Sequence, residues 1–196
     1  MTHRLVRNPA SLVLAALLLF PASAALAERP AAVSGTEAPA KIGIPNARMP
    51  VEGVLTGGQP TAEHLRAAAA AGYATVVNLR GDAEMASDEL AGFDERAIVE
   101  ELGMEYHSIP ISGGDDLSEA KARALSKLLA DPEARPMLVH CGSGNRVGAL
   151  FALEAFLVDR EDPEKALELG VAAGLTRLEP TVREKLGLPA AAPSDP

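Results

Sequence analysis

The chain has 196 residues, with 27 acidic residues against 18 lysines and arginines, and its formal net charge at pH 7 is −9. A surface with this charge repels nucleic acid and anionic lipid, so neither is expected as a partner. The length suits a single domain, because domains commonly span about 100 to 200 residues. The single cysteine, Cys141, excludes a disulfide bond within the chain.

Residues 1–27 have the pattern of an export signal. Arg4 and Arg7 precede an apolar run at residues 12–20, and small residues follow it at a cleavage site before Glu28. The run is shorter than the roughly 20 residues that a membrane-spanning helix needs, so no stable membrane anchor is expected after cleavage. We therefore expect an exported, periplasmic protein whose mature chain begins at Glu28.

The rest of the chain divides into a linker, a domain and a tail. Residues 28–50 are rich in Ala, Pro, Ser and Gly without a helical or strand period, which is typical of a flexible linker. The predicted domain covers residues 51–187. Residues 188–196 are expected to form a disordered tail.

The predicted domain alternates strands and helices. Segments with strand-like composition lie at residues 51–57, 74–79, 105–111 and 137–141. Helical patterns lie at residues 61–72, 90–102, 118–130, 146–159, 163–173 and 179–186, with Thr61 and Ser118 as candidate N-caps. This order predicts a single α/β domain with a mostly parallel central sheet of about four strands flanked by helices. The helix at 146–159 is apolar on almost every side and is expected to be buried.

Polar residues follow the ends of the predicted strands. Asn78 and Arg80 follow the second strand, the SGGDD loop at residues 112–116 follows the third, and Cys141 ends the fourth. In open α/β sheets, ligands bind beyond the carboxyl ends of the strands. These residues are therefore expected to gather along one edge of the sheet.

The segment VHCGSGNRVGAL, residues 139–150, joins the last predicted strand to a helix. Gly142 and Gly144 allow the backbone to curve tightly and to bring N–H groups close to an anion. The N-terminus of the following helix adds positive partial charge, which favours an anion or a cysteine thiolate. Arg146 supplies a planar guanidinium that can hold two oxygens of a phosphate or sulfate. The segment is therefore predicted to combine a nucleophile, Cys141, with an anion cradle.

Ser143 and Asn145 complete this loop and have two interpretations. They supply polar contacts to the anion or thiolate, or they are turn residues, since asparagine tolerates unusual backbone angles. A lone cysteine at the end of an apolar strand is by itself typical of a core residue. A cysteine, two glycines and an arginine within six residues at a strand-to-helix junction favour a functional role for Cys141.

The motif formed by His140-Cys141, Gly144, Arg146 and Gly148 resembles the His-Cys...Gly...Arg-x-Gly signature of cysteine-dependent protein phosphatases. The bacterial dual-specificity-like group is the most similar. The resemblance extends to GGQPTAEHLRAAAAAGYATVVNLR, YHSIPI and GLTRLEPTVREKLG, and so covers about residues 51–187. It implies a cysteine-phosphatase-like fold, a phosphocysteine on Cys141, binding of phosphoryl oxygens by Arg146, and no need for a metal or cofactor. The implied partner is a phosphorylated protein or a small phosphate ester.

Two features depart from that family pattern. Four residues separate Cys141 from Arg146, where phosphatases of this type have five, and Val147 replaces the hydroxyl residue that helps the thiolate to leave. The four-residue spacing also resembles the phosphatase-like domain found beside metallo-β-lactamase-fold hydrolases, and the shorter loop of rhodanese sulfurtransferases. The alternatives to a phosphatase are therefore a sulfurtransferase that carries a persulfide on Cys141, and a phosphoanion-binding module with little turnover.

A phosphatase also needs a proton donor for the leaving group, and a carboxylic acid on a loop is the usual solution. Asp115 and Asp116 lie where the resembling phosphatases carry this acid, and Asp116 is marginally preferred. Their other interpretation is an ordinary helix entry before Ser118, where the helix dipole favours acidic residues.

Two further residues are expected to support the site. His140 is expected either to orient the loop or to be a satisfied histidine at a strand end. Arg80 is expected to guide an anionic substrate or, alternatively, to form a salt bridge with Asp82 or Glu84. Asn78 is expected to tie the neighbouring loops together.

Overall fold

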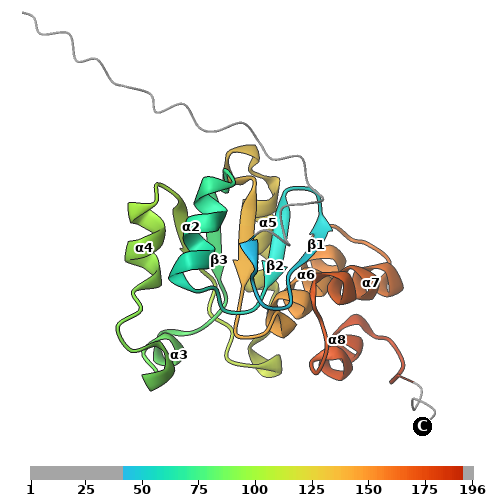
Figure 1. Ribbon diagram of the computed structural model, residues 1–196. Helices are drawn as coiled ribbons and strands as arrows, with labels where there is room; N and C mark the ends of the chain where they lie inside the picture. Colours follow the sequence, from blue (N-terminus) through green and yellow to red (C-terminus); the bar gives the residue numbers. More distant parts are fainter. Residues whose placement is uncertain (1–41, 192–196) are drawn as a thin grey trace, which may run out of the picture.

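The computed structural model describes residues 42–191, which form an α/β domain around one central sheet (Figure 1). The strands are β1 (Arg48–Val51), β2 (Val54–Gly57), β3 (Thr75–Asn78), β4 (Glu105–Ser108) and β5 (Met137–His140). Their order in the sheet is β1-β2-β5-β3-β4, and every pairing is parallel except that of β1 with β2. The predicted single α/β domain with a mostly parallel sheet is confirmed, with one strand more than expected.

Helices cover both faces of the sheet. They are α2 (Ala62–Ala70), α3 (Asp82–Met85), α4 (Glu95–Glu101), α5 (Glu119–Ala130), α6 (Asn145–Leu157), α7 (Pro163–Ala173) and α8 (Glu179–Leu186). Short 3₁₀ turns lie at η1 (Asp88–Leu90), η2 (Gly114–Asp116) and η3 (Pro132–Ala134). Helices α2 and α4 lie together on one side, with α7 and α8 on the other (Figure 1). Among the described residues, no helix is both long and apolar enough to cross a membrane.

Neighbouring residues of each inner strand point into two different cores. Val54 and Val77 belong to the core that includes α5, α6, α7 and α8, whereas Leu55 and Val76 belong to the core that includes α2 and α4. Successive strand side chains face opposite sides of a sheet, so each strand contributes to both cores. This double burial explains why the strands read as continuous apolar runs, as parallel sheets covered on both faces do.

The folded domain begins earlier than the sequence suggested. Ile42 and Ile44 are only 3% and 4% exposed and belong to the core beside α2 and α4, and β1 starts at Arg48. The predicted linker, 28–50, is therefore wrong over residues 42–50, because two isolated isoleucines do not stand out in an Ala- and Pro-rich segment. Residues 1–41, including the predicted signal, and residues 192–196 lie outside the described part of the chain.

One predicted helix is shorter than its apolar pattern. The pattern at 90–102 suggested one continuous helix, but η1 ends at Leu90 and Gly92 has a left-handed φ of 80°. Helix α4 starts only after Asp94, whose side-chain oxygen accepts a hydrogen bond from the Ala97 N–H at 3.0 Å. A residue with positive φ cannot continue a right-handed helix, so the glycine separates the two segments.

The two predicted N-caps behave differently. Thr61 caps α2, accepting a hydrogen bond from the His64 N–H at 3.3 Å, while the His64 ring accepts one from the Thr61 N–H at 3.2 Å. Ser118 stands at the N-cap position of α5, but its side chain makes no capping hydrogen bond. The helix starts are therefore as predicted, and only the first has the full capping box.

Helix α6 is the buried helix that its composition predicted, with its residues from Val147 to Ala155 all buried. Gly148 sits where the chain after α7 crosses it. A Cβ on Gly148 would lie 2.5 Å from the Gly170 carbonyl oxygen and 2.6 Å from the Leu175 Cα, and still closer to the Leu175 nitrogen. The glycine of the Arg-x-Gly motif is thus explained by backbone packing between two helices.

Candidate active site

The carboxyl ends of the parallel strands meet at one edge of the sheet, as the alternation of strands and helices predicted. Gly57 of β2 and Asn78 of β3 both pair with His140 of β5. The loop that starts at Cys141 therefore emerges between the segments that follow β2 and β3. This position brings the candidate nucleophile together with Arg80 and the segment after Gly57.

Cys141 lies at the base of this loop and is fully buried. The Gly144 N–H donates a hydrogen bond to the Cys141 sulfur over 3.1 Å, and Gly144 has the left-handed φ of 90° that only glycine adopts easily. A backbone N–H at a helix start stabilises negative charge on the sulfur. The loop is held from outside by Gln59, whose N–H donates to the Gly142 carbonyl at 3.3 Å.

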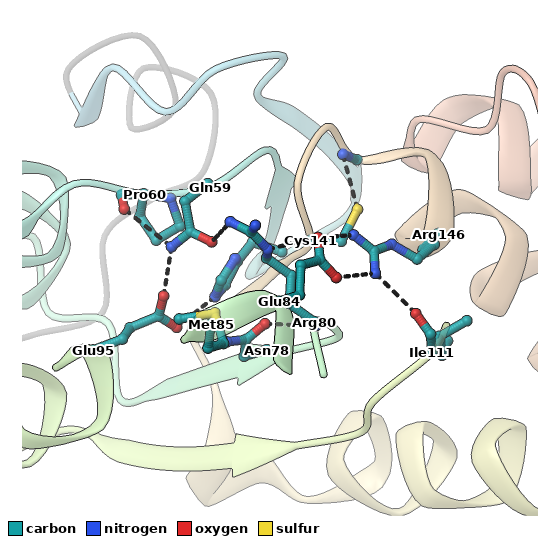
Figure 2. A network of polar contacts seen from close by, with 12 residues as sticks. Gln59, Pro60, Asn78, Arg80, Glu84, Met85, Glu95, Ile111, Cys141 and Arg146 are labelled. Atoms are coloured by element: carbon teal, nitrogen blue, oxygen red, sulfur yellow. Dashed lines mark hydrogen bonds and ion pairs between the residues drawn. The ribbon is translucent and has the colours of Figure 1, made fainter. Parts of the chain in front are cut away.

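Arg146 is held in place by two partners (Figure 2). Its Nη1 and Nη2 donate to the two oxygens of the Glu84 carboxylate at 2.7 Å each, and Nη1 also donates to the Ile111 carbonyl at 2.8 Å. These bonds use three of the five N–H donors of the guanidinium. The edge formed by Nε and Nη2 keeps the other two, and Nη2 lies against Gly142 of the loop. Arg146 can therefore present this edge to an anion above Cys141.

The charges of this pair are mutually stabilised. The hydrogen bond from Arg146 holds the pKa of the Glu84 carboxyl below its usual value, and burial opposes this only in part. The same hydrogen bond raises the pKa of Arg146, and the nearby charge of Cys141 raises it further. Both groups are therefore ionised throughout the neutral range.

Arg80 continues the network away from the cysteine. Its Nε donates to Glu84 and its Nη1 to the Gln59 side-chain oxygen, each at 2.7 Å, and Glu84 lies between the two arginines (Figure 2). Of the two roles predicted for Arg80, the structure shows the salt bridge with Glu84. Asn78 accepts a hydrogen bond from the Arg80 N–H at 2.7 Å and donates one to the hydroxyl of Tyr106 in β4 at 2.9 Å, so it links the end of β3 to the neighbouring strand.

His140 contacts a buried glutamate. Its Nε2 lies 2.7 Å from a Glu95 oxygen, and both side chains are excluded from solvent. The Gln59 side-chain N–H donates to the other Glu95 oxygen at 2.6 Å, which links this pair to Arg80. The His140 Nδ1 has no hydrogen-bond partner within residues 42–191. His140 thus anchors α4 and the segment after β2 behind the cysteine loop.

The other loop residues serve the walls of the site. The Asn145 side-chain oxygen accepts hydrogen bonds from the Thr176 N–H at 2.9 Å, the Thr176 hydroxyl at 3.1 Å and the Leu178 N–H at 3.2 Å. Asn145 therefore fixes the segment after α7 and does not point to an anion. Ser143 is exposed, and Val147 is completely buried in the larger core.

The two candidate acids differ in their surroundings. Asp116 forms an ion pair with Lys121 and accepts a hydrogen bond from the Ser112 N–H at 2.8 Å, and these contacts lower its pKa. Asp115 is exposed, and no residue of the described chain pairs with its carboxylate. Both lie a few residues after Ile111, whose carbonyl accepts a hydrogen bond from Arg146, so the η2 turn begins three residues after a contact with the site.

Comparison with known proteins identifies the family. A family model described as a DSP-PTPase phosphatase fused to NAD+ kinase matches residues 46–175 of the chain. This chain belongs to that phosphatase family. The matched residues begin just before β1 and end after α7, so they include Cys141, Arg146, Glu84, Arg80 and Gln59.

Other known proteins are similar to this chain in sequence or in fold. A β-lactamase hydrolase-like protein of Xylella fastidiosa is 32% identical over 124 residues, which cover 63% of this chain and 28% of that protein. The match thus spans less than a third of the relative's length. A putative phosphatase of Neisseria meningitidis has a TM-score of 0.58 at 22% identity, over 71% of this chain and 94% of its own. TpbA of P. aeruginosa, solved in complex with pTyr, has a TM-score of 0.50 at 22% identity, over 75% and 83%. At these identities the two structures show that the phosphatase fold is shared.

Sequence reasoning missed three residues of this candidate site. Glu84 appeared only as a partner for Arg80, although it also holds Arg146 across 62 positions of the chain. Gln59 and Glu95 did not appear as site residues. The glutamine could have been found from its place after a strand end, in the GGQP segment. Nothing in the sequence marks Glu95 as buried, because it stands at the start of an amphipathic helix among exposed acidic residues.

Proposed function

We propose that this protein is a cysteine-dependent phosphatase that hydrolyses phosphomonoesters through a phosphocysteine intermediate. The observation that carries the proposal is the arrangement of Cys141 and Arg146. The Cys141 sulfur accepts a hydrogen bond from the Gly144 N–H. Glu84 fixes the Arg146 guanidinium, and the Nε–Nη2 edge of that group stays available above the loop. Such an arrangement can hold phosphoryl oxygens and place phosphorus in front of the thiolate.

The proposed reaction has two steps. The Cys141 thiolate attacks phosphorus, the bond between phosphorus and the ester oxygen breaks, and the leaving oxygen takes a proton from an acid. Water then attacks the phosphocysteine, the bond between sulfur and phosphorus breaks, and inorganic phosphate leaves with the thiolate restored. Phosphate is transferred to water without any redox change, so no cofactor is needed for balance.

Asp115 is the proton donor that we propose for the first step. Asp116 is marginally preferred on sequence alone, but one of its oxygens accepts from Lys121 and the other from the Ser112 N–H, contacts that also lower its pKa, whereas Asp115 is exposed and has no partner among the described residues. Asp115→Asn should lower kcat by about 100-fold for an alkyl phosphate and by much less for p-nitrophenyl phosphate, whose leaving group needs no proton. Asp116→Asn should affect the two substrates equally, and the reverse pattern would move the acid to Asp116.

The substrate class is proposed to include phosphorylated proteins. TpbA, which shares the fold, was solved in complex with pTyr, which supports a phosphomonoester as the substrate of this chain. The purified protein should hydrolyse p-nitrophenyl phosphate, and Cys141→Ser and Arg146→Ala should abolish this activity. Full activity in Cys141→Ser would contradict the mechanism. Measuring the intact mass after thiosulfate treatment tests the sulfurtransferase alternative, because one added sulfur on Cys141 would indicate a persulfide.

We also propose that the protein is exported. The proposal rests on the apolar run after Arg4 and Arg7, which has the length of a signal-peptide core. Fractionation of cells that express the full chain should place the protein in the periplasm, with Glu28 as the first residue. A cytoplasmic protein that keeps Met1 would contradict this proposal.

A further inference from the structure

A second pocket lies against the outer side of the cysteine loop. It has a volume of about 330 Å³ and is separate from the larger hollow beside Arg80 and Tyr106. The residues that line it come from three segments of the chain and are Asn46, Arg48, Ser143, Gly174, Thr176 and Arg177. Ser143 belongs to the loop between Cys141 and Arg146, so the pocket and the proposed phosphate site share one wall.

The pocket is basic on an acidic protein. Two arginines and no carboxylate line it, whereas the chain as a whole carries nine more negative than positive charges. Arg48 and Arg177 are both exposed, and no described residue forms a salt bridge with either. Two unpaired guanidinium groups that face one small space attract an anion and offer it planar forks of donors.

The walls of the pocket are fixed to the cysteine loop. Asn46 has a left-handed φ of 55°, uncommon for a residue with a side chain, and its amide donates to the Ser143 carbonyl at 3.2 Å. On the opposite wall, Asn145 accepts hydrogen bonds from Thr176 and from the Leu178 N–H. Gly174 packs so closely that a Cβ there would lie 3.2 Å from the Gly144 carbonyl oxygen. The position of Arg48 and Arg177 relative to the loop is therefore set by direct contacts.

We propose that this pocket binds a second anionic group of the substrate, so that the preferred substrate is a phosphomonoester with a second phosphate nearby. The position of the first phosphate rests on the proposed function. Ser143 follows Cys141 by two residues, so their Cα atoms lie no more than about 7 Å apart. The pocket therefore lies next to the cysteine loop, and a compact bisphosphate could place one phosphate over Cys141 and direct the other toward Arg48 and Arg177.

The test measures binding without turnover. Propyl phosphate and propane-1,3-diyl bisphosphate, which differ only in the second phosphate, are titrated calorimetrically into full-length Cys141→Ser protein. The bisphosphate should bind about tenfold more tightly, since each exposed arginine contributes a modest charge-assisted bond. Adding Arg48→Gln and Arg177→Gln together should bring the ratio of the two dissociation constants to about one.

The control is Arg66→Gln, which removes another exposed arginine, one on α2 that forms no salt bridge with a described residue, and it should leave the ratio unchanged. Equal affinities for the two esters before any arginine is changed would overturn the inference. The inference would also be overturned if the ratio of the two dissociation constants stayed near ten after both pocket arginines were replaced. A fall of the same size in Arg66→Gln would overturn it too. A separate assay tests the proposed function: if that function is wrong, the protein shows no Cys141-dependent hydrolysis of p-nitrophenyl phosphate.

Discussion

Glu84 governs the direction in which Arg146 faces the loop. Its two oxygens hold Nη1 and Nη2, and Glu84→Gln would replace one accepting oxygen with a donor that repels the guanidinium. We expect kcat/KM for p-nitrophenyl phosphate to fall by about tenfold to 100-fold, because Arg146 loses its orientation. Glu100→Gln, which removes an exposed partner of Arg96 on α4, is the control and should leave the rate unchanged. Faster hydrolysis in Glu84→Gln would show that Glu84 competes with the substrate for Arg146.

The same substitution has a defined pH dependence. The pKa of Glu84 is lower in the folded protein than its unfolded value of about 4.3, so its ion pair stabilises the fold at every pH above that value. The contribution is lost as pH falls through the lowered folded pKa. Wild type should exceed Glu84→Gln in unfolding free energy by roughly 1 kcal/mol at pH 7, after allowance for solvent screening. In urea titrations, this difference in unfolding free energy should disappear below about pH 4. A difference that grows below pH 4 would mean that the folded protein raises the pKa of Glu84.

Val147 stands where the resembling phosphatases carry a hydroxyl residue. Its side chain has no hydroxyl, and it is fully buried in the same core as Cys141. Val147→Thr should raise the rate of phosphocysteine hydrolysis about fivefold, because an O–H that donates to the departing thiolate is worth about 1 kcal/mol. Burst kinetics with p-nitrophenyl phosphate measure this step directly. Val182→Thr, an equally buried helical valine on α8, shows the stability cost alone and should leave the rate unchanged.

At the level of elements, the packing of α6 against α7 depends on Gly148. Any Cβ there would clash with backbone atoms of Gly170 and Leu175. Backbone atoms cannot move out of the way by a rotamer change, as the end of a flexible side chain can. Gly148→Ala should lower the free energy of unfolding by about 3 kcal/mol, the upper part of the range for overpacking. Gly81→Ala is the matched control, because Gly81 has a φ of −80° and open space around its would-be Cβ. A small effect in both variants would mean that α7 moves freely away from α6.

The helices and strands that have a regular apolar pattern could be predicted from the sequence. The features that depend on contacts between distant residues could not. The buried helix α6 and the convergence of Asn78, Arg80 and Cys141 followed from periodicity and from the geometry of parallel sheets. The break before α4 depends on a positive φ at Gly92, which its residue type permits but does not require. The bond between Glu84 and Arg146 joins residues far apart in the chain, and no local pattern encodes such a pair.

For the whole molecule, the first described residues belong to the domain although their sequence reads as a linker. Ile42 and Ile44 fill the core beside α2, and burial of two such side chains is worth roughly 3 to 6 kcal/mol. This is a large share of the roughly 5 to 15 kcal/mol that stabilises a domain. A chain that starts at residue 42 keeps both isoleucines and β1, and its urea unfolding is the reference for shorter chains.

A chain that starts at residue 52 also loses β1, the antiparallel neighbour of β2, and should be largely unfolded at 25 °C by circular dichroism. The double change Ile42→Ser and Ile44→Ser separates the two contributions, since it removes the apolar contacts and keeps β1. It should lower the unfolding free energy by several kcal/mol, whereas Val171→Ser, on a side chain that is 46% exposed, should change it little. Equal stability of the chains that start at 42 and at 52 would mean that neither the isoleucines nor β1 contributes to the fold. The domain would then begin at residue 51, as the sequence predicts.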